Sequence, residues 1–175
     1  MSPNFAFADL ILLVPLAAII TYHDVRYRRI PNLFVLATLI SGIILNFIFG
    51  GLGGVLASVE GCALAFGLML MLHVLGAMGA GDVKLFASIG AVVGAPLVVP
   101  TFLIVALTGG VLALVTMVRA GSVRQTLLGV LQIFVGLLPG WQMPRFAVPA
   151  DRRHTIPYGV AITLGSLISL VVFRA

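Results

Sequence analysis

The chain has 175 residues, of which 61% are apolar and 9% are charged, and its mean hydropathy is +1.23. This composition excludes a soluble globular domain, because such domains carry about 25% charged residues. The net charge of +5 is no sign of nucleic-acid binding, since the ten basic residues lie in short loops between apolar runs. We therefore expect a single all-α transmembrane domain over residues 1–175, in contact with membrane lipid.

Apolar runs recur along the chain and predict about six transmembrane helices. Glycine-rich turns at 50–54 and 76–82 separate the second, third and fourth of them. Pro96 and Pro100 are expected to end the fourth helix, which is shorter than the third. The segment 119–153 is expected to form a cytoplasmic loop, part of which lies at the membrane interface. The predicted helices cover residues 5–22, 33–49, 55–75, 83–99, 101–118 and 157–173.

The basic residues are distributed unevenly between alternate loops. Nine of the ten lie in the first, third and fifth loops, whereas the second and fourth loops have none. Lys and Arg concentrate in cytoplasmic loops, so we expect these three loops in the cytoplasm and both termini in the periplasm of a bacterial inner membrane. The nine are Arg26, Arg28, Arg29, Lys84, Arg119, Arg124, Arg145, Arg152 and Arg153, and the tenth, Arg174, is near the C-terminus.

Two of the five acidic residues occupy the same predicted boundary of the membrane. Asp24 closes the first helix and Asp82 opens the fourth, and both positions are expected at the cytoplasmic side. A carboxylate at such a boundary is costly and is therefore a functional hypothesis. Two carboxylates that converge repel each other, so that one keeps its proton near neutral pH. The other three acids are Asp9, Glu60 and Asp151.

A pair of aspartates that shares a proton is suited to aspartic-protease chemistry. The ionised carboxylate takes a proton from water, while the protonated partner polarises the scissile carbonyl. Gly79 and Gly81 remove side chains where the backbone of a peptide substrate would approach Asp82. The histidines and acids show no spacing typical of a metal site, so neither a metal nor a cofactor is expected.

Structural roles are the alternatives for these residues. Asp24 is as well placed to balance the charge of the neighbouring arginines as to act in catalysis. Asp82 is placed to act as the N-cap of the fourth helix, a role that is compatible with catalysis. Lys84 is more often a topology anchor than a group that tunes the pKa of Asp82. Glu60 is expected to bond a neighbouring helix or to face a wet crevice, and His73 to form a hydrogen bond between helices. The spacings Gly50/Gly54 and Gly90/Gly94 indicate close helix packing.

Two rival functions remain open at this point. A small transporter or channel subunit would use Asp24, Glu60 and Asp82 to relay protons or to bind a cation. Such a relay predicts acids at several membrane depths and an internal repeat, but two of these acids share one boundary and no repeat is evident. A catalytically silent assembly subunit would not need both aspartates.

Three motifs resemble those of the type IV prepilin peptidases, a family of GxGD aspartic proteases. The stretch 79–84, GAGDVK, is similar to the GxGD signature, and Asp24 followed by 29–32, RIPN, resembles the first aspartate motif. The stretch 156–159, IPYG, resembles the third motif near the last helix. The resemblance implies Asp24 and Asp82 as catalytic residues. It also implies site-shaping roles for Gly79, Gly81, Lys84, Pro31, Asn32, Pro157, Tyr158 and Gly159.

The resemblance further implies a substrate class and a place of cleavage. Members of the family remove the leader peptide of type IV pilin-like precursors on the cytoplasmic side, just ahead of the apolar N-terminal helix. The chain has one cysteine and no paired CxxC motifs, so it resembles the short form associated with Flp/Tad-type pili, for which methylation of the new N-terminus is not expected. An archaeal preflagellin-type peptidase remains an alternative.

Overall fold

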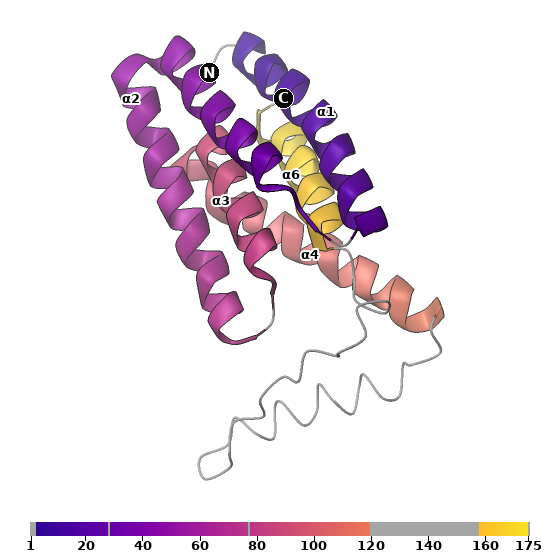
Figure 1. Cartoon of the computed structure of the whole chain (residues 1–175). Helices are drawn as coiled ribbons and strands as arrows, with labels where there is room; N and C mark the ends of the chain where they lie inside the picture. Colours follow the sequence, from indigo (N-terminus) through magenta and orange to yellow (C-terminus); the bar gives the residue numbers. More distant parts are fainter. Residues whose placement is uncertain (1–2, 28, 77, 120–157, 175) are drawn as a thin grey trace.

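The computed structural model describes residues 3–27, 29–76, 78–119 and 158–174, and all regular structure in these ranges is α-helical. The predicted loop 119–153, except Arg119, and Pro157 lie outside the described residues. The all-α prediction is therefore confirmed for the part of the chain that is described. Figure 1 shows the helices α1 (Pro3–Tyr27), α2 (Asn32–Val74), α3 (Ala80–Val93), α4 (Ala95–Arg119) and α6 (Tyr158–Arg174).

Helix α2 covers the second and third predicted helices and reverses its direction at Gly51 (Figure 1). Gly51 has φ 59° and ψ −144°, a backbone conformation that a residue with a Cβ rarely adopts. The side chains of Asn46 and Ser58 both donate to the carbonyl of Ala91. In a straight helix these two residues would be about 18 Å apart. The two halves of α2 therefore lie side by side as an antiparallel hairpin.

The boundary between α3 and α4 lies at Gly94, not near residue 100 as the prolines led us to expect. Gly94 has φ 76°, so the helical path ends there, and its N–H donates to the carbonyl of Gly90 at 2.9 Å. Pro96 lies in the first turn of α4, where its missing N–H is of no consequence. Pro100 is accommodated inside the helix. The glycine at this position, rather than the prolines, is the residue that breaks the chain.

The distribution of side chains is that of a membrane protein. Large apolar residues such as Leu52, Leu107 and Val111 are exposed on the outer faces of the helices, whereas the interior contains hydroxyl groups. Within the described residues, three helices are long and apolar enough to cross a membrane: α1 from Asp9, α2 and α4. Helix α6 is apolar but shorter. The predicted count of six spans stays a prediction.

Helix α6 packs antiparallel to α1 and to α4. Thr21 and Thr163 are hydrogen-bonded at 3.1 Å between α1 and α6, and Thr101 and Ser169 at 2.7 Å between α4 and α6. Such bonds satisfy hydroxyl groups that would be costly in an apolar interior. This packing brings the end of α1, the end of α2, the beginning of α3 and the beginning of α6 to one end of the bundle (Figure 1).

Candidate active site

Asp24 lies in the last turn of α1, because this helix continues to Tyr27 and does not end at residue 22 as predicted. Its side chain is 7% exposed and packs on the backbone of Gly159 at the beginning of α6. A Cβ added at Gly159 would lie 2.7 Å from Oδ2 of Asp24 and 3.0 Å from its Cγ. The absence of a side chain at Gly159 is thus what leaves room for the carboxyl group.

Asp82 lies in the first turn of α3, outside the described helices that are long and apolar enough to cross a membrane. The N-cap position belongs to Gly79 (φ −78°, ψ 150°), so the expectation that Asp82 is itself the N-cap is wrong. Asp82 nevertheless acts on the same helix terminus, since the Gly79 N–H donates to its Oδ2 at 3.3 Å. This contact orients the carboxyl group at the positive end of the α3 dipole.

The two aspartates are close enough to influence each other's ionisation. Burial, and next the negative charge of Asp24, raise the pKa of Asp82 from 3.8 to about 6, against the lowering effect of the Gly79 hydrogen bond. The phenol of Tyr158 also interacts electrostatically with Asp82. The pair therefore holds a proton at a higher pH than an isolated aspartate would, which is the property that acid–base chemistry requires.

Ile30, which lies between α1 and α2, reaches the beginning of α3. The side chain of Ile30 lies 3.9 Å from the position of a Cβ at Gly81, so that the glycine next to Asp82 contacts this residue. Pro31 precedes α2 with φ −65°, and its carbonyl accepts the N–H of Phe34 at 3.1 Å. Asn32 is exposed at the first position of α2. Within the segment RIPN, Ile30 is thus the residue that lies against Gly81, and Pro31 begins the turn into α2.

The structure does not bring every predicted site residue to the aspartates. Lys84 is exposed on α3 and is not among the groups that shift the pKa of Asp82. Pro157 lies outside the described residues. Among the described residues, no group of three or more His, Cys, Asp or Glu side chains is arranged to hold a metal ion.

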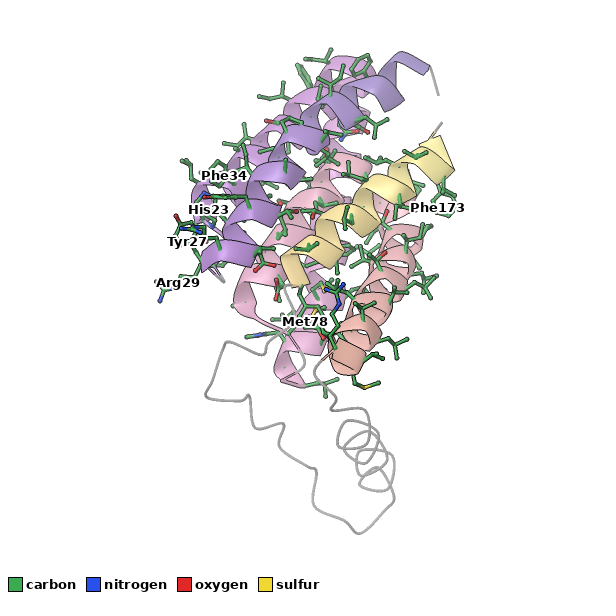
Figure 2. All side chains as sticks on the ribbon, turned by 90° about the vertical axis from the view of Figure 1, so that its right-hand side faces the viewer. His23, Tyr27, Arg29, Phe34, Met78 and Phe173 are labelled. Atoms are coloured by element: carbon green, nitrogen blue, oxygen red, sulfur yellow. The ribbon has the colours of Figure 1, made fainter. Side chains whose placement is uncertain are left out.

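Aromatic and basic side chains surround the end of α1 beside Asp24. His23 packs against Tyr27 and Phe34, with ring centroids 5.4 and 5.5 Å apart, and Figure 2 shows these residues together with Arg29 at one end of the bundle. Phe173 is at the opposite end of α6 (Figure 2). Tyrosine and arginine are typical of the membrane–water interface. The position of the aspartates at a membrane boundary stays a prediction.

Two supporting contacts were not predicted from the sequence. The contact of Gly159 with Asp24 explains why a glycine follows Tyr158, but only the fold reveals which residue it meets. His73, expected to bond another helix, instead bonds the carbonyl of Met78 through Nδ1 at 2.7 Å and so fixes the segment just ahead of Gly79. Asp9 is fully buried in α1, but it lies about 22 Å along the helix from Asp24 and is not part of the site.

Comparison with models of protein families finds a match for this chain. The model of the type IV leader peptidase family matches residues 11–114, which include Asp24 and Asp82. Comparison with curated proteins and comparison with solved structures find no match. Tyr158 and Gly159 lie beyond the matched residues, so their contacts with the aspartates are an observation of the structure alone.

Proposed function

This chain belongs to the type IV leader peptidase family, and we propose that it removes the leader peptide of pilin-like precursors with Asp24 and Asp82 as its catalytic pair. The single observation that carries this proposal is the convergence of the two carboxyl groups at one end of the bundle. Gly159 supports Asp24, and Gly79 supports Asp82. Each aspartate is thus positioned by a glycine from one of the motifs.

The proposed reaction needs no metal or cofactor. In the proposed reaction Asp82 is the acid, the role towards which its raised pKa points, and Asp24 is the base. Asp24 removes a proton from water as the water attacks the scissile carbonyl, while Asp82 donates its proton to the carbonyl oxygen. The proton on Asp24 then passes to the leaving amine, and Asp82 recovers its proton as the tetrahedral intermediate collapses.

Cleavage is proposed to take place at the cytoplasmic boundary of the bacterial inner membrane. Among the described residues, Arg26, Arg29, Lys84 and Arg119 are all exposed in or next to the links at the end that holds the aspartates, as the positive-inside rule requires. A basic leader would then stay in the cytoplasm while the apolar helix that follows it remains in the membrane. Precursors of the Flp/Tad type are the proposed substrates, with archaeal preflagellins as the alternative, and methylation of the product is not part of the proposal.

The test is co-expression with a Flp-type precursor, followed by gel mobility and N-terminal sequencing of the product. Wild type is expected to cleave the precursor, whereas Asp24→Asn and Asp82→Asn are expected to leave it intact. Glu60→Gln is the matched control, because Glu60 is an exposed acid on α2 next to Gly61, which packs on Gly90 and Gly94 at the opposite end of α3 from Asp82. Cleavage at the wild-type rate by either aspartate variant would refute the pair, and loss of cleavage in Glu60→Gln would favour a proton relay.

The orientation is tested separately by thiol labelling in a Cys62→Ser background. A cysteine at Arg29 probes the end of the bundle that holds the site, and a cysteine at Gly53 probes the opposite end, where an added Cβ meets nothing within 4 Å. Membrane-impermeant reagent added to intact cells is expected to label Gly53→Cys and to spare Arg29→Cys. The reverse pattern would place the site in the periplasm.

A further inference from the structure

A cavity of about 260 Å³ lies between α2, α4 and α6 and is not used by the catalytic pair. We call it the α4 groove and define it by Met69 on α2, Met78 in the following link, Gly110 and Ala113 on α4, and Tyr158 and Ala161 on α6. Its remaining walls are apolar. Figure 2 shows Met78 beside the beginning of α6 and the neighbouring part of α4.

The α4 groove begins at the catalytic site. Tyr158 lines it and also interacts electrostatically with Asp82. Met78 lines it as well and directly precedes Gly79, whose N–H binds the Asp82 carboxyl group. The residues of α4 that line the groove run from 102 to 113, about 16 Å along the helix axis, and a Cβ added at Gly109 would lie 3.9 Å from the ring of Tyr158. It is therefore an apolar passage that leads from the aspartates into the membrane.

The lining of the groove fits a helix better than it fits a flexible lipid chain. Four small residues, Ala106, Gly109, Gly110 and Ala113, follow one face of α4 along the cavity. Faces of this kind allow the backbone of a second helix to approach closely. At Gly110 an added Cβ would meet nothing within 4 Å, so this part of α4 is open to an incoming side chain. Two methionines on the facing wall can adapt to side chains of different shape.

We propose that the α4 groove binds the apolar helical segment that follows the scissile bond of the precursor. This inference rests on the proposed function and adds the place where the substrate docks. A peptide bond held between Asp24 and Asp82 has its apolar continuation at the mouth of the groove, and about 16 Å of helix corresponds to roughly eleven residues. The groove thus sets which residue of the precursor reaches the aspartates.

Disulfide trapping tests the location directly. The background is Cys62→Ser with Asp82→Asn, so that the precursor is retained uncleaved, and single cysteines are placed along the apolar segment of the precursor. Gly110→Cys lies in the groove, whereas Val111→Cys is its matched control on the same helix, because Val111 is 61% exposed and faces away from the cavity. Oxidation is expected to link Gly110→Cys to precursor positions spaced three or four residues apart, and to give no comparable pattern with Val111→Cys.

Filling the groove provides a second, kinetic readout. Gly110→Leu is compared with Gly67→Leu, a glycine of α2 that is equally open but does not line the groove. We expect Gly110→Leu to raise KM at least about tenfold with kcat little changed, the signature of lost ground-state binding, and Gly67→Leu to behave as wild type. Equal trapping at Val111→Cys, or an unchanged KM in Gly110→Leu, would overturn the proposal and leave the groove to a lipid chain. Failure of wild type to cleave the precursor would instead overturn the proposed function.

Discussion

The contact between Gly159 and Asp24 makes the substitution Gly159→Ala a sharp test of the site. The new Cβ would lie 2.7 Å from Oδ2, 3.0 Å from Cγ and 3.2 Å from Cβ of Asp24. Ordinary contacts begin near about 3.5 Å, so either the carboxyl group or the beginning of α6 must move by about 0.8 Å. A displacement of about 1 Å in a catalytic group costs up to about a hundredfold in rate.

We therefore expect Gly159→Ala to lower kcat by about ten- to a hundredfold with KM within about twofold of wild type. The assay is steady-state cleavage of a purified precursor in detergent, together with thermal unfolding of each variant. Gly67→Ala is the control, since the added Cβ meets nothing there. If Gly159→Ala cleaves at the wild-type rate while remaining folded, Asp24 is not held against α6 in the working enzyme, and the reasoning fails.

Three further predictions concern Asp82 and the interior of the α2 hairpin. Because Asp82 must carry a proton and has a pKa of about 6, kcat/KM should fall as the pH rises through that value, and a flat profile between pH 5 and 8 would contradict this. Its pKa is raised in the folded state, so stability is lost as the pH rises from about 4 to about 6. Asp82→Asn should avoid this loss, so at pH 8 its free energy of unfolding should exceed that of wild type by up to about 3 kcal/mol and its melting temperature should be higher. Below about pH 4 the two melting temperatures should be equal. Equal melting temperatures at pH 8 would exclude a buried charge at Asp82. Asn46→Leu should lower the unfolding free energy by about 1 to 3 kcal/mol, because Asn46 Nδ2 donates to the carbonyls of Gly42, Ala91 and Val92 at 3.0 to 3.1 Å; an unchanged melting temperature would show that these carbonyls are satisfied in another way.

Much of the fold follows from the sequence because the pattern of apolar runs and glycine turns is local. The reversal at Gly51 falls inside the predicted turn 50–54. The end of α3 does not follow from the sequence, because the spacing of Gly90 and Gly94 indicates a packing motif and the prolines indicate a later break. A positive φ at Gly94 depends on how α3 meets the α2 hairpin, where Asn46 and Ser58 bind its last carbonyls. That contact joins segments more than 30 residues apart and has no local signal.

Part of the candidate site also follows from the sequence, and the rest is revealed only by the fold. The convergence of Asp24 and Asp82 was predicted from charge segregation and the order of the helices, and the two groups do interact. The partners of the glycines were not predictable, because Gly159 meets Asp24 and Gly81 meets Ile30 only after the helices have packed. The burial of Asp9 was missed for the same reason, since its position near the beginning of α1 gave no sign of what covers it.

The central claim is that Asp24 and Asp82 act as one catalytic unit, and a double-mutant comparison of kcat tests it most directly. Asp24→Asn and Asp82→Asn are each expected to lower kcat for precursor cleavage at least about a hundredfold. The double variant is expected to be no slower than the slower single variant, because residues that act as a unit have non-additive effects. A single variant that cleaves at the wild-type rate, or losses that multiply in the double variant, would contradict the account.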